Sequence, residues 1–210
     1  SSPQEQKSMR SALKHIREYP LALFAIASVA IGHLAMVSIM VMTPVHMAHV
    51  DVSLTIIGLV ISVHVLGMYA LSPLVGSLSD RLGRVRVIQI GILTLLLSTV
   101  ISGKAQADDA YTLGVGLFLL GLGWSCTLIA GSTLLSESVS AEFKASSQGA
   151  SDLVMNLAGA GGGAIAGVII GTLSYGWLCL AAALPVLALG VMSLRLKSVP
   201  QASNDITLQP

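Results

Sequence analysis

The sequence is poor in charge. Only 10% of its 210 residues are Asp, Glu, Lys or Arg, whereas a soluble domain has roughly 25%. So few charges cannot cover the surface of a globule in which 54% of the residues are hydrophobic. The low charge therefore excludes a soluble protein. The formal net charge of +1 gives no indication of nucleic-acid binding.

Cysteine and catalytic patterns are also scarce. Cys126 and Cys179 fit neither a disulfide framework nor a Cys-x-x-Cys metal site, so we interpret them as small apolar side chains. His46 and His49 could share a helical turn, but histidines in a loop are more often solvated than bound to metal. The sequence has no nucleophile elbow, phosphate-binding glycine loop or zinc-protease motif. We therefore predict no enzyme, no cofactor and no metal site.

The sequence does contain six long apolar stretches. A helix needs about 20 residues to cross a ~30 Å hydrocarbon core, and without strand alternation such a stretch can satisfy its backbone only as a helix. We therefore expect an all-α membrane protein. Pro20 suits the first turn of the first helix, and Pro44 is expected to mark its far end. The predicted helices cover residues 21–41, 53–75, 85–102, 111–135, 147–170 and 173–194.

The basic residues predict the orientation. Of the 11 Lys and Arg residues, only Lys104 lies in a loop on one side, and the others lie in the terminal segments and the two loops on the opposite side. The positive-inside rule then places both termini in the cytoplasm, in a plasma (bacterial inner) membrane. We divide the chain into a cytoplasmic linker (1–20), a six-helix unit (21–195) and a cytoplasmic tail (196–210). The chain begins with Ser and lacks a convincing signal peptide, which favours a piece of a longer protein.

The loop after the second stretch has an ordered pattern of Gly, Asp and Arg. It reads Gly76-Ser-Leu78-Ser79-Asp80-Arg81-Leu-Gly83-Arg84-Val85-Arg86. This resembles the cytoplasmic signature Gly-x-Leu-Ala-Asp-Arg-x-Gly-Arg-Lys of the major facilitator superfamily, with Val85 as a departure at the second basic position. The glycines would allow close approach and a tight reversal, and Asp80 would cap a neighbouring helix. The basic side chains would pair with Asp80, with carboxylates across the interface between the halves, or with lipid headgroups; they are Arg81, Arg84 and Arg86.

A second loop supports the resemblance. Glu137, Lys144 and Gly149 stand where superfamily members often have Glu, then Pro and Arg, then Gly; Ser140 replaces the proline. The resemblance covers all six stretches, or one half of a twelve-helix transporter built from two three-helix inverted repeats. The segments 64–73 and 121–135 look like bacterial members, the latter in their C-terminal half. We expect the C-terminal half, partnered by the N-terminal half. A separately encoded half that pairs with a second copy remains open.

Several groups within the predicted helices are candidates for function or packing. His33 lies about 18 Å past residue 21 and His64 about 16 Å past residue 53, both near the bilayer midplane. We rank His64 above His33 as a residue of the transport path, because Gly67, Met68, Tyr69 and Ser72 follow it. Asp152, with Asn156 one turn later, is a candidate for a gate or a contact between halves. Four glycines at four-residue spacing predict close helix packing or a sliding surface: Gly159, Gly163, Gly167 and Gly171.

The resemblance implies secondary active transport of a small solute by alternating access, driven by an ion gradient, most often of protons, as a symporter or antiporter. The partners implied are the lipid bilayer, the other half, a small-molecule substrate and protons. The alternative is a non-transporting receptor or scaffold module built on the same six-helix fold.

Overall fold

The computed structural model describes residues 16–196, and over that range it contains only helices. Six segments are long and apolar enough to cross a membrane, which confirms the predicted all-α membrane fold. Most of the predicted linker and tail lies outside the described residues. The helices are α2 (Pro20–Ala48), α3 (Leu54–Tyr69), α4 (Ser72–Leu82), α5 (Arg84–Lys104), α6 (Ala110–Ser138), the short 3-10 helix η1 (Ala141–Phe143), α7 (Lys144–Thr172) and α8 (Tyr175–Arg195).

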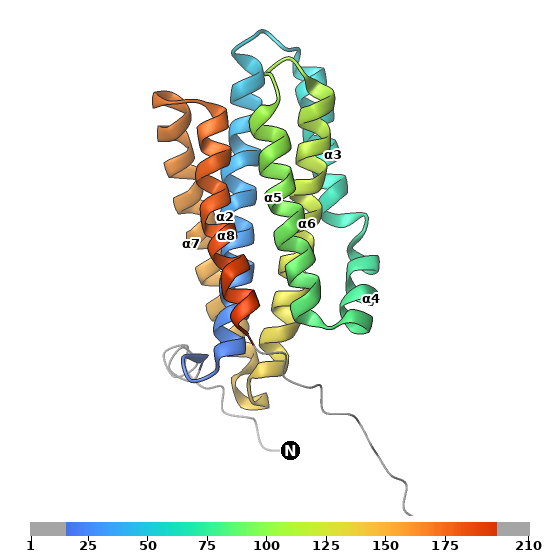
Figure 1. Ribbon diagram of the computed structural model, residues 1–210, viewed down its shortest axis with the longest axis vertical. Coiled ribbons are helices and arrows are strands. Elements are labelled where there is room, and N and C mark those ends of the chain that lie inside the picture. The colour runs from blue at the N-terminus through green and yellow to red at the C-terminus, as the bar shows by residue number, and fades with distance from the viewer. Residues whose placement is uncertain (1–15, 197–210) are drawn as a thin grey trace, which may run out of the picture.

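The helices form two layers (Figure 1). In one layer α3 packs on α6, α6 on α2, and α2 on α7. In the other layer α5 and α8 pack on each other and cover α6 and α2. The α4–α5 and α6–α7 connections lie at one end of the bundle, with the start of α2 and the end of α8. We call this the basic end, because it carries Arg81, Arg84, Arg86, Lys144 and Arg195.

The second membrane segment is two helices, where the sequence predicts one. α3 ends at Tyr69 and α4 begins at Ser72, with the chain turning at Ala70 and Leu71. Pro73 explains the interruption, because it has no N–H to donate to the Tyr69 carbonyl and its ring would clash with that carbonyl in a continuous helix. Proline is instead favourable in the first turn of a new helix. α4 consequently lies off the line of α3 (Figure 1).

The expectation that Pro44 ends the first helix is wrong. α2 continues through Pro44 to Ala48. A proline inside a membrane helix is tolerated where neighbouring groups compensate for the lost hydrogen bond. Pro44 leaves the carbonyl of Met40 without its helical donor, and the hydroxyl of Thr43 donates to the adjacent carbonyl, that of Ile39, at 2.8 Å. His46 therefore lies on a helix, stacked on Tyr175 with ring centroids 4.4 Å apart, and not in a loop.

Close backbone contacts at glycine bring α6 to its neighbours. A Cβ atom added to Gly121 would lie 2.5 Å from the carbonyl oxygen of His64 in α3. On the α5 side, Gly91 and Gly123 face each other, and a Cβ on either would lie 3.0 Å from the carbonyl oxygen of the other. Such small residues allow membrane helices to pack by backbone approach, since lipid provides no hydrophobic drive for association.

The glycines of α7 pack in a different pattern from the predicted four-residue row. Gly159 is close to His33 of α2, and a Cβ there would lie 2.6 Å from the imidazole Cδ2. Gly162 is the next close contact, since a Cβ there would lie 3.2 Å from the Leu34 carbonyl oxygen. Gly163 and Gly167 have only ordinary van der Waals neighbours, and Gly171 has nothing within 4 Å in the described chain. The contact face therefore drifts around α7, because 3.6 residues make a turn and a four-residue row does not stay in line.

Candidate functional site

The signature loop makes a sharp reversal between α4 and α5. Gly83 adopts φ 92° and ψ 151°, a backbone conformation that favours glycine, and this matches the tight reversal expected there. Gly76 is different: a Cβ there would meet nothing within 4 Å in the described chain, so no close backbone approach requires glycine. Leu78 packs partly buried against the core.

Arg84 joins the two loops of the basic end. Its Nη1 donates at 2.6 Å to the carboxylate of Asp80, which lies four residues earlier on α4. Its Nη2 donates to Glu137 Oε1 at 2.9 Å, and its Nε lies 3.2 and 3.3 Å from the two oxygens of the same carboxylate. Asp80 thus pairs with Arg84, one of the pairings expected for it, and caps no helix among residues 16–196. Arg81 and Arg86 are exposed and form no ion pair within the described chain.

The second signature loop contributes Glu137 to this cluster. Lys144 is the exposed first residue of α7 and forms no ion pair with a described residue. Gly149 is partly buried. Beside it, the side-chain amide of Gln148 donates to the carbonyl of Ser132 at 2.8 Å and ties α7 to α6. The two loops resembling the superfamily therefore meet at the basic end through one guanidinium.

His64 is fully enclosed between α3 and α6. Its side chain has 0% exposure, and Nδ1 lies 2.7 Å from the carbonyl oxygen of Leu117. Because a carbonyl only accepts, Nδ1 carries the proton, and Nε2 is a buried acceptor without a partner in the described chain. This surrounding is typical of a packing residue, and it leaves His64 no exposed face within the described chain.

His33 lies where α2 meets α6 and α7, and it is partly exposed. The indole Nε1–H of Trp124 donates to its Nδ1 at 3.1 Å. The edge of the Tyr69 ring contacts Trp124, with centroids 6.1 Å apart and planes at 81°. The sequence did not single out this trio. A signal was available, since only 4% of the residues are aromatic and both Tyr69 and Trp124 fall within predicted membrane segments.

Asp152 and Asn156 lie together on an exposed face of α7. The side-chain amide of Asn156 donates to the backbone carbonyl of Asp152 at 2.7 Å, so it bonds locally and not to another helix. Both residues are exposed in the described chain. Farther along α7, Gly159 packs against His33 of α2. Asp152 and Asn156 therefore lie on the same helix as this contact, but nearer the basic end.

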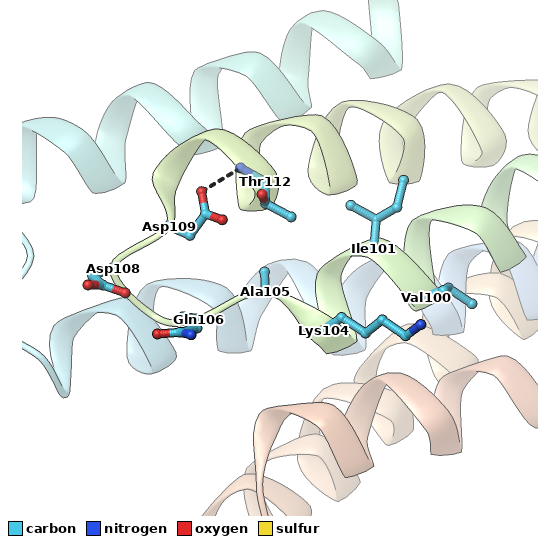
Figure 2. A pocket seen from close by; sticks show the side chains of 8 residues that line it. All are labelled: Val100, Ile101, Lys104, Ala105, Gln106, Asp108, Asp109 and Thr112. Carbon is cyan, nitrogen blue, oxygen red and sulfur yellow. Dashed lines mark hydrogen bonds between the residues drawn. The ribbon is translucent and has the colours of Figure 1, made fainter.

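At the opposite end, the α5–α6 loop encloses a surface cavity of about 580 Å³ (Figure 2). The carboxylate of Asp109, which lines this cavity, caps α6 by accepting from the backbone N–H of Thr112 at 3.0 Å. Hydrogen bonds from Thr112 lower the pKa of Asp109 below its usual value. Lys104 and Asp108 also line this cavity. We interpret Asp109 as a helix cap. No group of three or more potential metal ligands occurs among residues 16–196.

Comparison with known proteins identifies the family. A family model described as Major Facilitator Superfamily matches residues 5–209. The chain belongs to the major facilitator superfamily. Two relatives from Bacillus subtilis bear the names uncharacterized MFS-type transporter YddS and YdeG. They are 39% and 38% identical over 69% and 80% of this chain. The riboflavin transporter RfnT of Brucella anthropi is 26% identical over 68% of the chain.

The superfamily membership confirms the resemblance seen in the signature loops. With six membrane-spanning helices, the chain is an integral protein of the plasma membrane, in a family of transporters and not of enzymes. The matched segments cover only 33%, 39% and 35% of the three relatives. The chain thus spans about half the length of these superfamily members.

Proposed function

We propose that this chain is the C-terminal half of a secondary active transporter that moves a small organic solute by alternating access. Its partner is the N-terminal six-helix half of the same transporter, with both termini of this half in the cytoplasm. A second copy of the chain is the alternative partner. The name of the riboflavin transporter favours an organic solute. At 26% identity we propose only this class of solute and not riboflavin itself.

The observation that carries the proposal is the sharing of Arg84 between Asp80 and Glu137. The three residues come from α4, α5 and α6, so one guanidinium fixes three helices relative to one another at the basic end. The carboxylate side chains are 72% and 51% exposed, and exposed ion pairs contribute only about 0.2–1 kcal/mol each. Contacts of this strength can favour one conformation and still break during each cycle.

Proton coupling is the second part of the proposal. His33 is the better candidate, because it is partly exposed whereas His64 is enclosed. Neutral His33 accepts from Trp124, and a protonated imidazole has no acceptor to offer. Protonation would therefore break the Trp124–His33 contact between α6 and α2. Asp152 and Asn156 remain candidates for a contact with the other half.

Reconstitution of the complete transporter tests this function. Proteoliposomes containing a pH-sensitive dye would be supplied with riboflavin and other small organic solutes, and we expect solute-dependent proton movement. Glu137→Gln should slow it, whereas Glu142→Gln should not, since Glu142 is an exposed acid with no ion pair in the described chain. Solute binding without any flux would instead favour the receptor or scaffold alternative. Flux by this chain as an isolated monomer would contradict the half-transporter assignment.

A further inference from the structure

Three rings from three helices form a row within the membrane segment. Tyr69 ends α3, Trp124 lies on α6 and His33 on α2. Neighbouring ring centroids are 6.1 Å apart on each side of Trp124. Trp124 is nearly buried at 7% exposure, whereas Tyr69 is 60% exposed and His33 is partly exposed. Trp124 therefore positions the two outer rings, and those outer rings are free to contact a solute.

The hydrogen bond to Trp124 defines which group His33 presents. The indole nitrogen is only a donor, so Nδ1 of His33 accepts and its proton resides on Nε2. Nε2 has no hydrogen-bond partner in the described chain and is not enclosed. Beside it stands Gly159, where a Cβ would lie 2.8 Å from Nε2. The glycine allows α7 to pack this close to the imidazole.

The interruption of the second membrane segment lies at the same place. Tyr69 is the last residue of α3, and Pro73 leaves its carbonyl without the usual helical donor. One turn on, the hydroxyls of Ser72 and Ser125 lie 3.3 Å apart between α4 and α6. Broken membrane helices mark binding sites in transporters, because irregular backbone is tolerated where it lines a cavity. The break is an observation independent of the rings.

Charge is missing from this row. No described Asp, Glu, Lys or Arg forms a hydrogen bond or ion pair with His33, Trp124 or Tyr69. A charged solute would find no counter-charge there, whereas a flat π-system would find the exposed Tyr69 ring. A carbonyl on that π-system would find the imidazole N–H.

We propose that Tyr69 and His33, positioned by Trp124, bind a planar conjugated solute that carries a ring carbonyl. The solute's ring contacts Tyr69, and its carbonyl accepts from Nε2–H of His33. This inference rests on the proposed transport function and names the substrate class of that function. Tyr69 and His33 touch the solute, and Trp124 acts through them.

The test is binding to the complete transporter in lipid nanodiscs, measured by isothermal titration calorimetry. The probes are 2-quinolone, its fully saturated counterpart decahydro-2-quinolone, and indole, which is planar but has no carbonyl. One aromatic contact changes Kd by about three- to tenfold, so 2-quinolone should bind more tightly than the saturated lactam by that factor. The comparison of probes on the unaltered protein does not depend on any variant folding.

Variants then assign the contacts. Tyr69→Leu should raise the Kd for 2-quinolone by the same three- to tenfold factor, and Tyr69→Phe should leave that Kd unchanged. Tyr111→Leu is the matched control, because Tyr111 is 82% exposed on α6 and does not belong to the row. His33→Leu should weaken the binding of 2-quinolone and leave the affinity for indole unchanged. Equal affinities for the planar and saturated lactams, no binding of either, or equal losses at Tyr69 and Tyr111 would overturn the proposal.

The outcome separates this site from the function on which it rests. Planar-selective binding without any solute flux would refute transport and leave the site in place. Movement of a saturated solute that Tyr69→Leu does not alter would refute the substrate class and leave transport in place.

Discussion

Replacing Gly121 by Ala tests whether backbone approach at glycine holds α3 against α6. A Cβ at this position would lie 2.5 Å from the His64 carbonyl oxygen and 2.8 Å from the Met68 nitrogen. Both are backbone atoms and cannot rotate away. An ordinary contact needs ~3.5 Å, so the two helices would have to separate locally by about 1 Å. That movement would also stretch the 2.7 Å contact between His64 and Leu117.

The magnitude follows from two opposing effects. Overpacking of this kind costs about 1–3 kcal/mol, whereas Ala in place of Gly in a helix gains up to about 1 kcal/mol. We therefore expect Gly121→Ala to lower the free energy of unfolding by about 1–2 kcal/mol. Gly114→Ala on the same helix is the control, because a Cβ there meets nothing within 4 Å in the described chain, and it should be neutral or stabilising.

The assay is unfolding of the purified transporter in mixed micelles with increasing SDS, followed by circular dichroism. The two variants share a helix and a chemical change, so intrinsic helix propensity cancels in their difference. If Gly121→Ala unfolds at the same SDS fraction as Gly114→Ala, the α3–α6 contact is loose and the reasoning fails.

Three further predictions concern single contacts. Glu137→Gln should reduce transport more than Asp80→Asn, as measured by initial flux, because Glu137 accepts from two nitrogens of Arg84 and Asp80 from one. Tyr175→Phe should cost about 0.5–1.5 kcal/mol in SDS unfolding, since its buried hydroxyl lies 2.8 Å from a threonine hydroxyl. His33→Gln should flatten transport rates between about pH 5.5 and 8, whereas His64→Gln should lower stability and leave the pH profile unchanged. A flattened profile for the His64 variant alone would restore our first ranking.

The sequence was sufficient to predict the helices, because length and hydropathy determine which segments cross a membrane. Three prolines lie inside its apolar stretches, and it could not distinguish the effects of Pro44 and Pro73. Pro44 and Pro73 both interrupt an apolar stretch, yet α2 continues through Pro44 and the second segment breaks before Pro73. Each proline follows a residue whose hydroxyl donates to the carbonyl four residues earlier, Thr43 to Ile39 and Ser72 to Met68, so this contact does not explain the difference. Thr43 also contacts Tyr175 of α8, and Ser72 contacts Ser125 of α6; a local sequence pattern does not show such contacts.

The same limit explains the histidines. A rise of 1.5 Å per residue gives the depth of His33 and His64 in the bilayer, and both lie near the midplane. Depth does not give the direction in which a side chain points around the helix. That direction depends on partners such as Trp124, 91 residues from His33, and Leu117, 53 residues from His64. The two partners of Arg84 differ in the same way. Asp80 is four residues away and can be predicted from the sequence, whereas Glu137 is 53 residues away and cannot.

The strengths of these contacts differ along the bundle. Around the middle of α6 the helices meet through backbone atoms at Gly121 and Gly123, where even one methyl group does not fit. At the basic end they meet through exposed ion pairs of Arg84 that cost little to break. In between, α3 gives way to α4 without a continuous helix. We therefore expect the six-helix core to move as a rigid body during transport. Conformational change would then concentrate at α4 and the signature loop, because these are the places where no close glycine contact resists it.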